Sequence, residues 1–116
     1  MHKNMYELTK SDKKIARKVI ETGLQRDFET SILDIDKIIG RWKKKELTNR
    51  EAYHEIFSKV KENDKYIARV YDDLRGSTYL ITIIGLLNNK VLSEADLGEF
   101  NEGLRNYLLG VREVLK

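Results

Sequence analysis

The chain has 116 residues, of which 41% are hydrophobic and 35% are charged, and its formal net charge is +3. This composition is typical of a folded protein, and the length suits one domain with a single core. The chain has no cysteine, which excludes disulfides, thiol catalysis and thiolate metal sites, and no proline-rich or linker-like run. We therefore expect a single domain over residues 1–116.

Residues 1–9 show no hydrophobic periodicity, and we expect a frayed tail there. Ser11 followed by Asp12 predicts the N-cap and first turn of a long helix that runs to about Lys45. Apolar residues recur along this helix at steps of three and four: Phe28, Ile32, Ile35, Ile39 and Trp42. Such steps place them in one narrow stripe. Gly23 leaves an alternative open, in which the helix breaks there and folds back into a compact five-helix monomer.

A second long helix begins at Thr48, because Thr48 and Glu51 form a capping box. We expect it to reach about Arg75, with Gly76 as its left-handed C-terminal residue. Its stripe consists of Tyr53, Ile56, Val60, Ile67, Val70 and Leu74. Asn63 stands where this spacing requires an apolar residue, and a polar residue in such a seam can fix register or oligomeric state.

A short third helix is predicted over residues 77–89, which are apolar nearly all round. The β-branched content also permits a strand, although the chain has no second strand-like run to pair with it. Asn88, Asn89 and Lys90 form the following turn.

A fourth helix is predicted from Ser93, which with Asp96 resembles a capping box, to the end of the chain. Its stripe consists of Leu97, Phe100, Leu104, Tyr107, Val111 and Val114. Gly98, Gly103 and Gly110 interrupt it, and each interior glycine costs about 1 kcal/mol relative to alanine. We expect close approach of a neighbouring backbone to compensate for them.

These elements predict an all-α protein, an antiparallel helical bundle of four main helices: two long, one short and apolar, and one medium. The lengths do not match, because a hairpin of roughly 40 to 50 Å cannot be covered by the two shorter helices. Part of its stripe is then left for another subunit, and we expect a homodimer.

Catalytic chemistry finds little support. Glu51 and His54 share one helix face, as in half of a di-iron carboxylate site. A complete site needs a second such pair, yet the other histidine is His2 in the expected tail, and Glu51 already serves as a cap residue. No nucleotide fingerprint or nucleophile elbow is present. A metal-dependent enzyme centred on Glu51 and His54 is the third hypothesis, and we expect no catalytic residue, metal or cofactor.

Basic residues gather around the turn between the two long helices: Arg41, Lys43, Lys44, Lys45 and Arg50. With Trp42 beside them they suggest an alternative function, non-specific nucleic-acid binding. Because Trp42 continues the first stripe, we expect it instead to belong to the core at the end of the bundle.

The favoured function is a non-catalytic interaction module or a small subunit of a larger complex. Cations flank the stripe of the second long helix, and Arg50, Lys65 and Arg69 are the candidates for binding an acidic protein partner. The longest apolar stretch, residues 79–87, is too short for a membrane span, so we expect no membrane partner and a cytoplasmic location. No motif in the chain resembles that of a known family.

Overall fold

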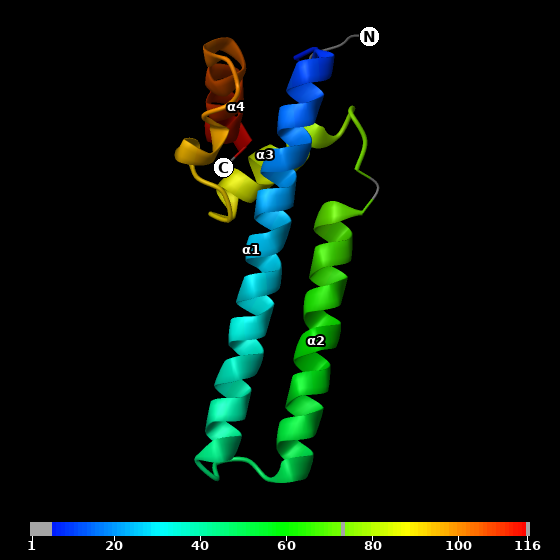
Figure 1. Cartoon of the computed structure of the whole chain (residues 1–116), viewed down its shortest axis with the longest axis vertical. Helices are drawn as coiled ribbons and strands as arrows, with labels where there is room; N and C mark the ends of the chain where they lie inside the picture. The colour runs from blue at the N-terminus through cyan, green and yellow to red at the C-terminus, as the bar shows by residue number, and fades with distance from the viewer. Residues whose placement is uncertain (1–5, 73, 116) are drawn as a thin grey trace. The chain divides into compact units, whose positions relative to one another are not determined.

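The computed structural model describes residues 6–72 and 74–115, and within these ranges it contains helices and no strand. The elements are α1 (Lys10–Lys43), α2 (Asn49–Tyr71), α3 (Tyr79–Asn88), a short 3₁₀ helix η1 (Glu94–Leu97) and α4 (Glu102–Leu115) (Figure 1). The expected all-α class with four main helices is confirmed. The strand alternative for residues 77–89 is wrong, because this segment forms α3.

The chain divides into two compact units. One comprises residues 1–23 and 73–116, and so holds the first part of α1 together with α3, η1 and α4. The other comprises residues 24–72, which form the second part of α1 and α2. Helix α1 is continuous from Lys10 to Lys43, so the long helix is as expected and the alternative of a break at Gly23 is wrong. The single domain expected over residues 1–116 stays a prediction.

The N-terminus of α1 is capped by Thr9 and not by Ser11. The Thr9 hydroxyl accepts a hydrogen bond from the backbone N–H of Asp12 at 3.0 Å, and the Asp12 carboxylate accepts one from Thr9 N–H at 3.1 Å. This reciprocal pair is a capping box with aspartate in place of glutamate. The ring of Tyr6 lies 5.4 Å from that of Tyr107. Tyr6 and Thr9 thus make contacts with the helices, residues 1–5 lie outside the described residues, and the frayed tail expected over residues 1–9 stays a prediction.

Helix α2 begins as expected. Thr48 accepts from Glu51 N–H at 3.1 Å, and the Glu51 carboxylate accepts from Thr48 N–H at 2.8 Å. The helix ends at Tyr71, because Asp72 is already extended, with φ −73° and ψ 154°. The expected continuation to Arg75 is wrong. Gly76 is not left-handed either, since no described glycine has a positive φ.

Helices α1 and α3 both end in a Schellman motif with lysine in the left-handed position. Lys45 has φ 67° and Lys90 has φ 64°. After α1, the N–H of Glu46 donates to the carbonyl of Arg41 at 3.0 Å, and the N–H of Lys45 to that of Trp42 at 2.9 Å. Glycine adopts this conformation without the steric cost that a side chain incurs.

Replacement of Lys45 by glycine is therefore expected to raise the free energy of unfolding by about 1 kcal/mol. The matched control is Lys43→Gly, which removes the same charge from the last residue of α1 and is expected to lower stability by up to about 1 kcal/mol. Urea denaturation followed by circular dichroism measures both. Equal effects of the two variants would contradict the assignment.

The first unit has a core of its own. The buried apolar side chains come from all its helices: Ala16, Val19, Ile20, Tyr79, Leu80, Ile83, Ile84, Leu86, Leu87, Leu92, Leu97, Phe100, Leu104 and Leu108. Helix α3 is buried on most sides, as its composition predicts, and it packs against α4. Among the described residues, the six bulkiest fully buried side chains all lie in this unit.

The fourth helix does not start where the sequence indicates. The Ser93–Asp96 capping box is present, but it opens only the short η1. Helix α4 begins at Glu102, after Asn101 accepts from the N–H of Leu104 at 2.8 Å and so acts as a second N-cap. The expected close approach at Gly110 is also wrong, because a Cβ built there would meet nothing within 4 Å.

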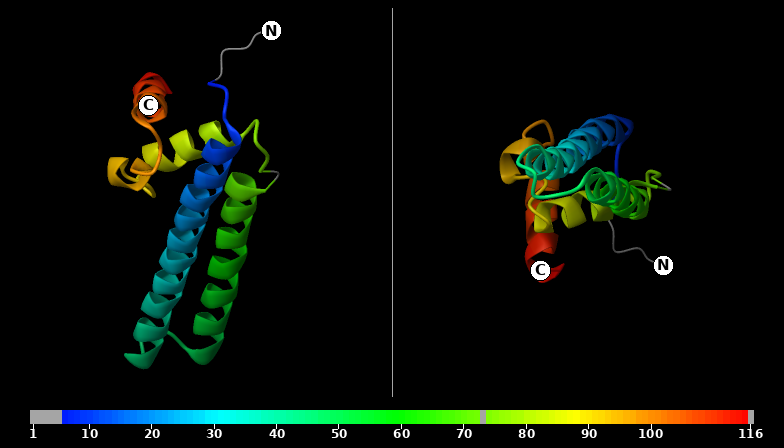
Figure 2. Two further views of the ribbon diagram at one scale, coloured as in Figure 1. Left: turned by 45° about the horizontal axis from the view of Figure 1, so that its top comes forward. Right: turned by 90° about the horizontal axis from the view of Figure 1, so that it is seen from below.

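The second unit is a helical hairpin. The second part of α1 and helix α2 run side by side and antiparallel (Figures 1 and 2). Within residues 24–72 the buried apolar side chains are Ile38, Ala52 and Tyr71. The hydroxyl of Tyr71 donates to the carboxylate of Asp27 at 2.5 Å and so ties the end of α2 to α1. This unit thus has far fewer buried apolar side chains than the first.

Candidate interaction surface

Large apolar side chains face solvent on the hairpin. The exposed ones are Phe28, Ile32, Leu33, Trp42, Tyr53, Phe57 and Val60. Ile32 is 65% exposed, Phe57 59% and Tyr53 71%. Phe28, Ile32, Trp42, Tyr53 and Val60 belong to the two long stripes and are the part of these stripes that lacks cover within the chain, while Ile35 and Ile67 are half-buried.

Apart from Leu33, which is turned about 140° the opposite way round α1 from Ile38, the exposed side chains of the helices gather on one side of the hairpin. We call the hairpin apolar face the set Phe28, Ile32, Ile35 and Ile39 of α1 with Tyr53, Ile56, Phe57, Val60 and Ile67 of α2. The buried Ile38 and Ala52 mark the seam where the two helices meet. Successive residues of a helix are turned by about 100° around its axis. On this basis the face residues of α1 point, on average, roughly 70 to 90° away from Ile38, and those of α2 roughly 70 to 90° away from Ala52, in the same sense of rotation. Because the helices are antiparallel, this shared offset puts both stripes on the same face.

Two contacts between the helices agree with this geometry. Trp42 Nε1–H donates to Asn49 Oδ1 at 2.7 Å, and both residues are rotated from the seam toward the apolar face. Arg41 Nη1 lies 3.0 Å from Glu55 Oε1, and both of these residues are rotated the opposite way. One side of the hairpin is therefore apolar, and the other carries an ion pair between the helices.

The predicted partner-binding cations are exposed but do not form one line. Arg50, Lys65 and Arg69 all lie on α2, and Arg69 is turned about 100° around the helix from Arg50. The guanidinium of Arg69 lies 5.8 Å from the ring centroid of Tyr66. Lys61, which was not among the predicted cations, lies at the apolar face, since its Nζ is 6.0 Å from the ring centroid of Phe57. The sequence could have indicated this contact, because Lys61 follows Phe57 by four residues and such residues are neighbours on a helix.

In the turn between α1 and α2, the three lysines make no ion pair among the contacts that the structure describes, whereas Arg41 does. Lys43, Lys44 and Lys45 are exposed. Arg41 pairs with Glu55 and lies 4.0 Å from Glu46. The expectation of a core Trp42 is wrong, because this side chain is 43% exposed.

Glu51 and His54 do not converge with other ligands. The Glu51 carboxylate caps α2 at Thr48, and His54 is exposed with its ring 5.9 Å from that of Tyr53. Within residues 6–72 and 74–115 no group of three or more histidine, aspartate or glutamate side chains is placed to hold a metal ion. His2 lies outside the described residues.

Asn63 has a buried amide nitrogen that finds no hydrogen-bond acceptor in the described part of the chain. An unsatisfied buried donor costs about 1 to 3 kcal/mol. Its predicted role in fixing register or oligomeric state stays a prediction.

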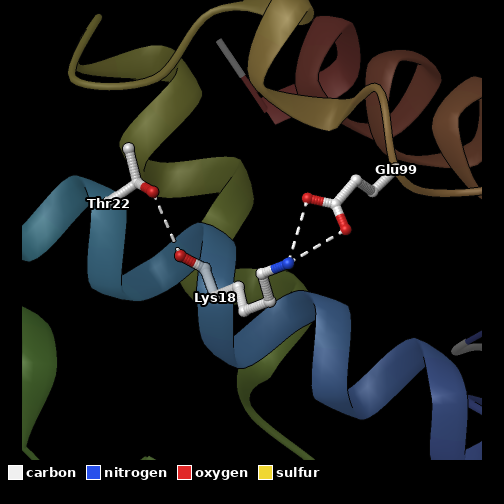
Figure 3. Close-up of polar contacts among 3 residues, drawn as sticks. All are labelled: Lys18, Thr22 and Glu99. Carbon is white, nitrogen blue, oxygen red and sulfur yellow. Dashed lines mark hydrogen bonds and ion pairs between the residues drawn. The ribbon is translucent and has the colours of Figure 1, made fainter.

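An open cleft of about 750 Å³ lies in the first unit, between α1 and the segment around η1. Lys18 of α1 crosses it to Glu99, with Nζ 3.2 and 3.3 Å from the two carboxylate oxygens (Figure 3). Its charged lining mixes both signs: Lys14, Arg17 and Lys18 with Glu21, Asp96 and Glu99. This mixture favours neither anionic nor cationic ligands, so the cleft is a weaker candidate than the hairpin apolar face.

The fold and this surface define a small all-helical protein with an exposed apolar face on a helical hairpin. No family model, curated protein or solved structure matches the chain. None of the described helices is both long and apolar enough to cross a bilayer.

Proposed function

We propose that the protein is a non-catalytic interaction module, or a small subunit of a larger complex, that binds another protein through the hairpin apolar face. The observation that supports this is the contrast between five large exposed side chains on that face, Phe28, Ile32, Tyr53, Phe57 and Val60, and the few buried apolar side chains of the hairpin. Exposed apolar patches of this kind mark interaction sites. Phe28, Tyr53 and Phe57 supply the aromatic anchors that carry most binding energy at interfaces.

Cations at the edge of the face would select among partners. Lys61 stands against Phe57, and Arg50 lies about 20° further round α2 from Phe57. Positive charge at the rim of an interface speeds encounter with an acidic partner and disfavours a basic one. Lys65 extends this edge. We place this binding in the cytoplasm, as the sequence predicts.

Photo-crosslinking in the native host tests the proposal. A benzophenone amino acid replaces Phe57 on the face or, as a control, the exposed Thr30 on the other side of the hairpin. We expect protein adducts from position 57 that are absent or much weaker from position 30. Equal labelling, or no adduct from position 57, would contradict the proposal.

A second candidate function is non-specific nucleic-acid association through the basic turn. It is favoured by the exposed Lys43, Lys44 and Lys45 beside the partly exposed indole of Trp42. Such binding would weaken steeply between low and moderate salt and would disappear when the three lysines are changed to glutamate. The absence of binding at low salt would remove this candidate.

A further inference from the structure

We propose that the hairpin apolar face is covered by the same face of a second copy of this chain, so that two hairpins close into a four-helix bundle. This inference rests on the proposed function and names its partner. The two helices of the hairpin suit such pairing, because residues 24–43 of α1 and Asn49–Tyr71 of α2 are similar in length. Two copies would therefore cover each other from end to end.

The area of the face is close to what a specific dimer requires. It spans residues 28–39 on α1 and residues 53–67 on α2, or roughly 20 Å along the helices, and two packed helices are about 20 Å wide. A flat projection of about 400 Å² per copy gives about 800 Å² in total, somewhat below the roughly 1,000 Å² that a specific interface needs. Interdigitation of the exposed side chains increases the buried area beyond this projection.

The apolar composition fits a second copy because each partner would present the same side chains. The nine residues that define the face are apolar, and one charged residue, Asp64, projects among them, about 120° round α2 from Ala52. In the single chain the hairpin buries Ile38, Ala52 and Tyr71, while Phe28, Ile32, Tyr53 and Phe57 stay exposed. A second face would enclose Phe28, Ile32 and Phe57 between four helices, as in the core of a bundle.

The charges at the edges favour one arrangement of the copies. The outer edge of α1 carries Glu29 and Asp36, and the outer edge of α2 carries Arg50 and Lys61. A twofold axis parallel to the helices sets α1 of one copy over α2 of the other, so that acidic and basic edges meet. An axis perpendicular to the helices would set α1 over α1 and oppose like charges, which is unfavourable.

Two residues depart from this pattern: Lys43, at the last position of α1, and Asp64, which lies within the angular range of the face on α2. The contacts from Arg41 to Glu55 and from Trp42 to Asn49 fix the register of α1 against α2 along the hairpin. In this register Glu29 and Lys61 lie close to the same position along the hairpin axis. Glu29 and Lys61 are thus the pair whose exchange tests the arrangement.

Sedimentation equilibrium of the purified full chain over a wide concentration range tests the second copy. We expect a reversible shift from the monomer mass of 13.6 kDa to twice that value. Ile32→Lys is expected to raise the dissociation constant at least about 30-fold, because it places a charge within the paired faces. The control Thr30→Lys adds the same charge on the other side of the hairpin and is expected to leave the constant within about threefold.

The charge exchange gives an independent result. Glu29→Lys alone is expected to weaken pairing, and the double variant Glu29→Lys with Lys61→Glu is expected to restore it. A wild-type chain that stays monomeric at every concentration would overturn pairing with a second copy, whatever the folding state of the variants.

The crosslinking experiment separates this failure from failure of the proposed function. A monomeric chain whose position 57 labels a different protein would overturn only the second copy. A monomeric chain without adducts at position 57 would overturn both.

Discussion

Replacement of Leu104 by alanine is expected to lower the free energy of unfolding by about 3 to 5 kcal/mol. Leu104 lies on α4, its side chain has no solvent exposure, and it belongs to the core of the first unit. The truncation removes buried methyl groups and leaves a cavity that close-packed neighbours fill only in part. Urea denaturation monitored by circular dichroism measures the change, with the slope of the transition as a check that the same unit unfolds.

The matched control is Val114→Ala in the same stripe of the same helix. Val114 is 81% exposed, so its truncation is expected to change stability by less than about 0.5 kcal/mol. Similar losses for Leu104→Ala and Val114→Ala would show that α4 does not present the face that the structure assigns to it.

Replacement of Tyr71 by phenylalanine is expected to lower the free energy of unfolding by about 1.5 to 3 kcal/mol near neutral pH. Tyr71 is buried, and its hydroxyl donates to the Asp27 carboxylate at 2.5 Å. A hydrogen bond to a charged group is stronger than one between neutral groups, and the substitution removes the donor that Tyr71 supplies to the Asp27 carboxylate. Tyr53→Phe is the control, because Tyr53 is mostly exposed and is expected to tolerate the change.

The same pair predicts a dependence on alkaline pH. Burial, followed by the hydrogen bond to Asp27 and its negative charge, raises the pKa of Tyr71 above its ordinary value of about 10. A raised pKa in the folded state means that the contribution of Tyr71 is complete below about pH 10 and is lost as the pH rises further. The stability difference between wild type and Tyr71→Phe should shrink by up to about 1.4 kcal/mol per pH unit there. Urea denaturation across this range measures it, and a constant difference would contradict the buried pair.

Helix positions could be predicted where local signals are strong. The capping box at Thr48 and the apolar run of α3 gave boundaries close to the observed ones. Errors arose where two signals of the same kind compete. Ser93 and Asn101 can each cap a helix, and Thr9 and Ser11 likewise, and only tertiary packing decides which one starts the long element.

The candidate surface could be predicted only in part. Periodicity identifies the stripe that contains Ile32 and Ile39, but it does not say which neighbour covers the stripe. Trp42 and Ile38 lie in similar directions around α1, yet one is exposed and the other buried. The mismatch in helix lengths was the useful signal, since it predicted that part of the hairpin would lack cover within the chain.

The two units differ in how much apolar burial they have to offset the loss of conformational entropy on folding. The first encloses Phe100, Leu104 and Leu108 within its own helices. The second, with few buried apolar side chains, resembles an isolated pair of helices, which gains most of its stability from packing an apolar face against a partner. We therefore expect the hairpin apolar face to need such a partner.

Hydrogen exchange at several protein concentrations tests that claim most directly. Amides of α2 between Ile56 and Val70 are expected to become more protected as concentration rises, while those of α4 between Leu104 and Val111 stay unchanged. Ile32→Lys should abolish the concentration dependence, and Thr30→Lys should keep it. Strong protection of α2 that is the same at every concentration, including the lowest, would contradict the account.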